Sequence, residues 1–189
     1  MKKSITLSMI TVMFLISCVS TKKKIAAAQP YPNQIEWPER YLPENANFFV
    51  HNEIEIDASP EKVWNILIDA EKWTDYYEGA ANVEVQGSST GKLTENVVFT
   101  WKTMGMTFES TIKEFKPYSR LSWESVKPSI KGYHAWLIIP TETGSKLITE
   151  ESQYGFMTTL EKTFMPNKLE KLHQIWLEEI KKKAEAKAN

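Results

Sequence analysis

Hydrophobic and polar positions follow two different periods along the chain, and the changes between them predict one folded domain from residue 48 to residue 189. Acidic and apolar residues alternate from residue 53 to residue 58, which is typical of a strand with one buried face. The period then becomes helical between Ser59, a favourable N-cap residue, and Ile68. A second short helix is expected before Gly79.

Six further segments of strand character follow the two short helices, with turn signals between them. They read NVEVQG, LTENVVFTWKTM, MTFESTIKEFKP, RLSWESV, GYHAWLIIP and KLITEESQYG. Because consecutive strands joined by short turns usually pair with each other, these segments and the first strand predict an antiparallel sheet of about seven strands.

A long helical stretch is expected from residue 158 to residue 187, and Pro166 should kink or divide it. Apolar residues return on one face of this stretch, and that face is predicted to lie on the sheet. These residues are Leu160, Phe164, Leu169, Leu172, Trp176 and Ile180.

The stretches IEIDASPEKVWNILIDAEKW, GYHAWLIIP, KLITEESQYG and LEKLHQIWLEEIKKKAEA resemble the polyketide cyclase/dehydrase branch of the START-like, or SRPBCC, superfamily. The resemblance covers residues 48 to 187. It implies an α+β helix-grip fold, in which a curved antiparallel sheet wraps around the long C-terminal helix and two short helices follow the first strand. It also implies a deep apolar cavity, which lipids, sterols or aromatic polyketides occupy in various members of the superfamily.

Large apolar residues of one strand parity are candidates for the wall of such a cavity, although core packing alone explains the same pattern. The inward parity of the strand around His134 stays open, because both of its faces carry aromatic residues. His134 is therefore interpreted either as a ligand-binding or acid–base residue or as a structural histidine. The candidate ligand-binding residues are Tyr76, Tyr77, Phe99, Trp101, Phe108, Trp123, His134, Trp136, Phe156, Leu160 and Phe164.

Motifs for catalysis and for metal binding are weak in this sequence. The three histidines are far apart in the chain, so we expect no metal site and no cofactor. Glu150 and Glu151 are adjacent in a predicted strand, so they should point to opposite faces and cannot act as a carboxylate pair. Arg120 is the only arginine in the predicted domain. No catalytic residue is therefore assigned from the sequence.

The composition narrows the class of partner. A formal net charge of −1 provides no basic field to bind phosphates, so nucleic acid is not expected. The chain has 7 Trp, 7 Tyr and 8 Phe, and this aromatic content suits either a packed core or a pocket for an apolar ligand.

The amino-terminal segment predicts export. A cationic start and an apolar run up to Ile16 have the layout of a signal peptide over residues 1 to 17. The stretch from Leu15 to Cys18 resembles the lipobox of bacterial lipoproteins, in which the cysteine is acylated and becomes the new amino terminus. An ordinary signal peptide, or an untargeted chain with a buried thiol, remains the alternative.

Residues 18 to 47 are expected to form a Pro-rich tether, from which Trp37, Tyr41 and Leu42 dock on the domain. Val19 and Ser20 replace the aspartate of an inner-membrane retention signal, so the predicted location is the bacterial envelope, at the outer membrane if the cell has one.

Three functions are carried forward from the sequence. The first is a lipid-anchored protein that binds a small hydrophobic molecule between the sheet and the C-terminal helix. The second is a cyclase or dehydratase that acts on an aromatic or polyketide-like substrate. The third is an envelope scaffold without a ligand.

Overall fold

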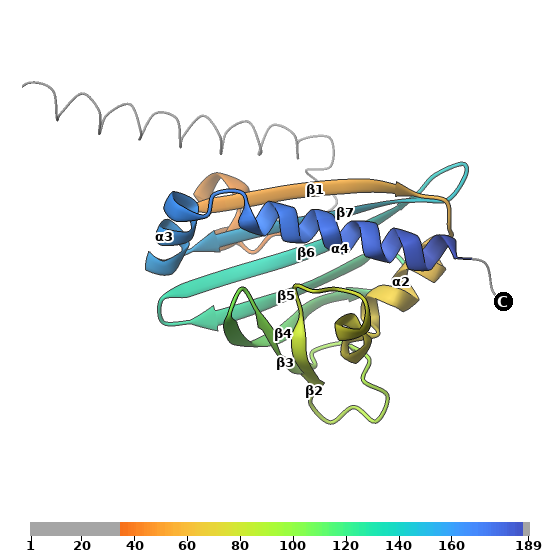
Figure 1. The fold of residues 1–189 in the computed structure, drawn as a ribbon, viewed down its shortest axis with the longest axis horizontal. Coiled ribbons are helices and arrows are strands. Elements are labelled where there is room, and N and C mark those ends of the chain that lie inside the picture. The colour runs from red at the N-terminus through yellow and green to blue at the C-terminus, as the bar shows by residue number, and fades with distance from the viewer. Residues whose placement is uncertain (1–34, 187–189) are drawn as a thin grey trace, which may run out of the picture.

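The computed structural model describes residues 35–186, and their core is a seven-stranded antiparallel sheet in the order β1-β7-β6-β5-β4-β3-β2 (Figure 1). Cys18 and the expected signal peptide lie outside the described residues, as does most of the tether. The strands are β1 (Phe48–Ile56), β2 (Ala81–Val85), β3 (Val98–Thr103), β4 (Met106–Lys116), β5 (Arg120–Lys127), β6 (Ile130–Pro140) and β7 (Ser145–Tyr154).

The longest helix, α4 (Lys168–Glu185), lies across one face of the curved sheet (Figure 1). Its contacts with other elements are mainly to β1 and to α2. The shorter helices are α2 (Pro60–Ile68), α3 (Phe156–Phe164) and the 3-10 turns η1 (Glu39–Tyr41), η2 (Pro43–Asn45) and η3 (Ala70–Asp75). This arrangement confirms the predicted α+β helix-grip fold with two short helices after the first strand.

Local sequence explains where the helices begin and end. Ser59 caps α2, since its hydroxyl accepts a hydrogen bond from the backbone N–H of Lys62 at 3.3 Å. The predicted division of the C-terminal helical stretch is confirmed, because α3 ends at Phe164 and α4 begins at Lys168. Pro166 lies in this gap, where its ring and its missing N–H prevent a continuous helix.

The contacts of β6 show which of its residues face α4, a question that the sequence left open. His134 and Trp136 face α4, where both rings contact Trp176. Tyr133 and Ala135 face the other way and pack against the amino-terminal segment. Docking of that segment is confirmed for Tyr41, which is fully buried.

Residues 35–47, expected to belong to the tether, therefore pack as part of the folded unit. They cover the outer face of the sheet, the one opposite α4. Within the described range, no helix is long and apolar enough to span a membrane.

Under α4 the core is unusually rich in tryptophan. Trp176 of α4 lies 4.9 Å from Trp73, 5.0 Å from Trp136 and 6.0 Å from Trp101, measured between ring centroids. Trp123 contacts the same group, at 5.7 Å from Trp73. These rings fill much of the space between the sheet and α4, where the resemblance implied a deep cavity.

Candidate functional site

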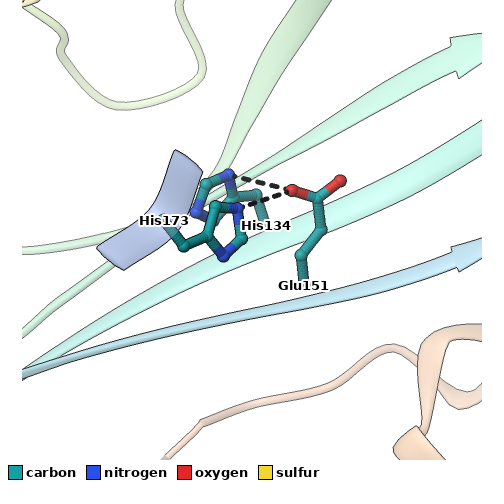
Figure 2. A group of neighbouring side chains, drawn as sticks. All are labelled: His134, Glu151 and His173. Atoms are coloured by element: carbon teal, nitrogen blue, oxygen red, sulfur yellow. Dashed lines mark hydrogen bonds and ion pairs between the residues drawn. The ribbon is translucent and has the colours of Figure 1, made fainter. Parts of the chain in front are cut away.

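Three side chains from three elements meet beneath α4: His134 from β6, Glu151 from β7 and His173 from α4 (Figure 2). The register of the strand pair places His134 directly opposite Glu151. His134 Nδ1 lies 3.3 Å from Glu151 Oε2, and His173 Nε2 lies 3.2 Å from the same oxygen. Two imidazoles therefore share one carboxylate oxygen. We call these three residues the His–Glu–His cluster.

Neighbouring polar groups orient the cluster. Thr149 Oγ1 lies 2.7 Å from His134 Nε2, and the Gln153 amide donates a hydrogen bond to Glu151 Oε1 at 2.6 Å. The two imidazole rings stack with centroids 4.6 Å apart and planes 24° apart. Within residues 35–186, the buried atom His173 Nδ1 has no hydrogen-bond partner. The cluster thus contains one nitrogen whose hydrogen-bonding capacity is unused.

Burial controls the charge of the cluster. Burial, together with the charge of His173, lowers the pKa of His134 to about 3 against the opposing effect of Glu151. Burial also acts to raise the pKa of Glu151, but the hydrogen bond from His173 and the charges of the two imidazoles outweigh it, so this pKa is lowered. At neutral pH the cluster therefore presents a carboxylate whose side chain is 14% exposed beside a neutral His134.

The cluster borders a cavity of about 40 Å³ between the sheet and α4. Most of the cavity wall is apolar, with aromatic rings from the sheet, Met104 from the β3–β4 turn and Met106 from the start of β4. This turn is a tight two-residue connection, in which Met104 and Gly105 have φ angles of 53° and 84°. A volume of this size holds an ion or a water molecule or two, but no organic ligand.

A second carboxyl group reaches the same cavity from α3. Glu161 is only 5% exposed, and among the described residues its Oε1 has no hydrogen-bond partner. Burial, together with the charge of Glu151, raises the pKa of Glu161 to about 7 against the opposing charge of Lys168. A carboxyl group with this pKa can donate or accept a proton at neutral pH.

The structure brings five of the candidate ligand-binding residues to this cavity. They are Tyr77, Trp101, Phe108, Trp123 and His134. Tyr77 also stacks on Trp176 at 4.3 Å, and burial raises its pKa.

Three other candidates lie away from the cavity wall. Phe99 and Trp136 are buried in the aromatic core beside the cavity, where they contact Trp123 at 5.6 Å and 6.3 Å. Tyr76 is half-buried, and its ring lies 4.8 Å from Lys183 Nζ near the end of α4. These residues pack the core or its margin.

The α3 candidates differ most from expectation. Phe156 is 70% exposed and Phe164 is 76% exposed, while Leu160 is half-buried and outside the cavity wall. The expected face assumed that one helical phase runs from residue 160 to residue 180. The break around Pro166 resets that phase, so Thr158 and Glu161 form the buried side of α3 instead.

Sequence reasoning missed Glu151, Glu161 and His173 as cavity residues. The expectation of no metal site rested on the separation of the three histidines along the chain, but the fold stacks His134 on His173 because α4 folds back over the sheet. One signal was present, because the turn after Pro140 sets the hairpin register. Counting outward from the pair of Pro140 and Ser145 places His134 opposite Glu151.

The prediction that Glu150 and Glu151 face opposite ways is confirmed. Glu150 Oε1 lies 2.7 Å from Nδ1 of His51, on the face away from α4. Glu53 follows at 3.6 Å from Nε2 of the same ring. Arg120 also lies outside the cavity wall, where it bonds to Glu114 at 2.5 Å and Glu36 at 2.6 Å.

Comparisons with known proteins agree with this fold. The model of a family described as polyketide cyclase / dehydrase and lipid transport matches residues 48–185. The crystal structure of the hypothetical protein jhp0584 from Helicobacter pylori is 28% identical, with a TM-score of 0.75, over 80% of this chain and 96% of that chain. No curated protein matches the chain.

Two further solved structures are more distant in sequence. The Zhui aromatase/cyclase from Streptomyces sp. R1128 is 13% identical, with a TM-score of 0.61, over 72% of this chain and 93% of that chain. Norcoclaurine synthase from Thalictrum flavum, in complex with dopamine and hydroxybenzaldehyde, is 16% identical. Its TM-score is 0.56, over 75% of this chain and 88% of that chain. At these identities the two structures support the fold alone.

Proposed function

The chain belongs to the polyketide cyclase / dehydrase and lipid transport family, and on that premise we propose that it binds a small aromatic molecule with one polar group between the sheet and α4. The observation that carries this proposal is the composition of the cavity wall. Aromatic rings from Trp101, Phe108 and Trp123 line it, and the His–Glu–His cluster supplies polar atoms. Apolar walls with a few fixed polar groups are the usual design of a small-molecule site.

Binding requires the cavity to expand. Its volume of about 40 Å³ is well below the roughly 300 Å³ or more of typical ligand pockets. Met104, in the turn between β3 and β4, and Met106, at the start of β4, are half-buried and line the cavity. Methionine side chains are flexible and adapt to new neighbours. We therefore expect the ligand to displace these two side chains while the strands stay in place.

Tryptophan fluorescence tests this proposal directly, because three tryptophans line the cavity. Hydroxybenzaldehyde and dopamine serve as aromatic probes, and a medium-chain fatty acid serves as the aliphatic one. We expect saturable quenching by an aromatic probe. The variant Thr103→Phe, which fills the cavity edge, should weaken the probe's affinity at least tenfold.

Thr107→Phe is the matched control, since Thr107 is exposed on the neighbouring strand and outside the cavity wall. Equal affinities in the two phenylalanine variants would contradict binding in this cavity. Saturable binding of the fatty acid alone would overturn the choice of an aromatic ligand.

We further propose that the protein works at the cell envelope, anchored by acyl groups on Cys18. The support is the sequence around this residue, a lipobox-like stretch behind an apolar run. More than one acyl chain is needed for stable anchoring, and lipoprotein maturation supplies them. Radiolabelled palmitate should enter the wild-type chain in a bacterial host and be absent from Cys18→Ser. Equal labelling of the two chains would refute the anchor.

Acid–base catalysis is the second candidate function, favoured by the position of Glu161. Its carboxyl group shares the cavity with His173 and Tyr77, and its pKa lies near 7. A base here could remove a proton from carbon beside a carbonyl group, and solvent would return one. In deuterated buffer, an aryl methyl ketone should then exchange its methyl protons faster with protein than without it. The faster exchange should disappear in Glu161→Gln, whereas a rate no faster than in buffer would exclude this activity.

A further inference from the structure

The nitrogen–oxygen distances in the His–Glu–His cluster match those between ligands of a single metal ion. Zinc binds nitrogen and oxygen ligands at about 2.0–2.1 Å, so two ligand atoms on one tetrahedral ion lie about 3.3 Å apart. The two imidazole nitrogens lie 3.3 Å and 3.2 Å from Glu151 Oε2. All three ligand atoms lie within 4.8 Å of one another. The two nitrogen–oxygen separations therefore match those around a single metal ion, and the residue types match as well.

We propose that His134 Nδ1, His173 Nε2 and Glu151 Oε2 bind one divalent transition-metal ion, with zinc the best match to these ligands. Two histidines and one carboxylate form a ligand set typical of catalytic zinc, which leaves a fourth position for water or a substrate atom. Because all three residues line the cavity, that fourth position would open onto it. A bound ion would polarise a carbonyl or hydroxyl oxygen placed there.

Electrostatics favours a cation at this place. Burying a carboxylate is costly unless a positive charge compensates it. Glu151 has the two imidazoles and the Gln153 amide as its partners, none of which is permanently charged. Glu161, which is 5% exposed, adds a second carboxyl group to the same cavity. A divalent ion would offset this concentration of acidic groups.

The surroundings resemble the support that metal ligands usually have. Histidine ligands commonly use their second nitrogen for a hydrogen bond, which fixes the ring orientation. Thr149 Oγ1 provides this contact to His134 Nε2 at 2.7 Å, and Gln153 holds the other oxygen of Glu151 at 2.6 Å. Two of the three ligands are therefore already oriented by side chains of β7.

The third ligand, His173, must turn to complete the site. The lone pairs of the two ligand nitrogens lie in the planes of their rings and have to converge on one ion. The two rings are stacked with their planes only 24° apart, so in this arrangement the lone pairs do not converge. Since His173 Nδ1 has no hydrogen-bond partner among residues 35–186, rotation of this ring disturbs one hydrogen bond, to Glu151, and the stacking on His134. We expect the ring of His173 to rotate about its Cβ–Cγ bond when the ion binds.

Cobalt titration of the full-length chain tests the site, after dialysis against a chelator. We expect one equivalent of Co²⁺ to bind with the intense visible bands of four- or five-coordinate cobalt, and Zn²⁺ to displace it. His173→Asn should weaken the affinity about 100-fold or more, since losing a ligand costs at least as much as losing a partner of a ligand. Thr149→Val should weaken it about tenfold.

Glu150→Gln is the matched control, because Glu150 pairs with His51 on the opposite face of the same strand. Its cobalt affinity should equal that of the wild type. Equal affinities in Glu150→Gln and His173→Asn would overturn the proposal, and so would the absence of the cobalt bands. A second measurement, described next, uses the wild-type chain alone, so folding defects in the variants do not affect it.

That measurement is the imidazole NMR spectrum during zinc titration. The ring signals of His134 and His173 should change with one equivalent of zinc, while those of His51 stay in place. A change confined to His51 would refute the assignment. Both experiments use only metal ions, so metal binding can succeed or fail whether or not the cavity takes an aromatic ligand.

Discussion

Glu150 and Glu151 are consecutive residues of β7, and each meets a histidine, but the two pairs lie on opposite faces of the sheet. On the outer face, Glu150 bonds to His51 at 2.7 Å in a simple cross-strand pair. On the inner face, Glu151 meets two imidazoles and borders a cavity. The same pair of residue types, glutamate and histidine, therefore occurs in two different environments. The alternation of side chains along β7 alone determines which glutamate lies on which face.

What covers each face differs as well. The outer face is covered by residues 35–47, where Tyr41 is buried and its hydroxyl donates to Glu124 at 2.8 Å. On the inner face, beneath α4 and α3, His173 Nδ1 and Glu161 Oε1 lack hydrogen-bond partners among the described residues. An unpaired buried polar atom costs about 1–3 kcal/mol. The inner face thus bears a cost in stability, which is expected where binding or chemistry takes place.

Trp176→Ala should have the largest effect on stability. Trp176 is fully buried and contacts four other tryptophans, so its removal leaves a large void under α4. Loss of a buried tryptophan typically costs about 3–5 kcal/mol. Urea unfolding should show a decrease of about 4 kcal/mol in the free energy of unfolding. Trp37 is half-buried on the outer face, so Trp37→Ala should lower the free energy of unfolding by less than half as much. An equal decrease would contradict this difference between the faces.

Tyr41→Ala should come next and should act on the outer face alone. The change removes a fully buried ring that packs on Tyr133 and Tyr154, each at 5.3 Å. We expect a loss of about 2–3 kcal/mol in the free energy of unfolding. Residues 35–47 should also become sensitive to limited proteolysis. Cobalt affinity at the inner cluster should stay unchanged, and a parallel loss of affinity would show that the two faces are coupled.

Acid should weaken the outer face through Glu124. Burial acts to raise its pKa, but the hydrogen bond from Tyr41 and the charge of Arg40 outweigh burial, so the pKa is lowered. A lowered pKa in the folded state gives stability above the ordinary carboxyl range, and this stability is lost as the pH falls through the lowered pKa. The amount should be about 1–2 kcal/mol.

Urea unfolding at a series of pH values from about 7 to about 3 measures this contribution. In Glu124→Gln the stability should be lower at neutral pH and should fall less on acidification. The other carboxyl groups are present in both proteins, so the difference between the two curves isolates Glu124. Parallel curves would mean that Glu124 adds no pH dependence.

Much of the fold follows from local periods in the sequence. Alternation marks the strands, Ser59 marks a helix start, and Pro166 divides the last helical stretch. The opposite directions of Glu150 and Glu151 follow from strand geometry alone. These features depend on neighbours in the chain, which is why the sequence suffices for them.

The site depends on distant contacts, which local periods do not determine. His173 reaches Glu151 only because α4 folds back over the sheet. The exposure of Phe164 follows from the helix break, which changes the face that α3 turns inward. The small cavity results from the way tryptophans of several elements fill one space. Composition indicates many aromatic residues, but it does not indicate how closely they pack.

The smallest predicted effect concerns the outer histidine pair itself. A double-mutant cycle with His51→Ala and Glu150→Ala should give a coupling energy of about 1 kcal/mol, because the pair makes one well-formed and nearly buried hydrogen bond at 2.7 Å. The control cycle pairs Lys146 with Glu53, which are 3.2 Å apart and more exposed. Its coupling should be below about 0.5 kcal/mol and should decrease with added salt. If the His51 cycle showed the same small, salt-sensitive coupling, the outer pair would be a surface contact, and only the inner glutamate would have a buried histidine partner.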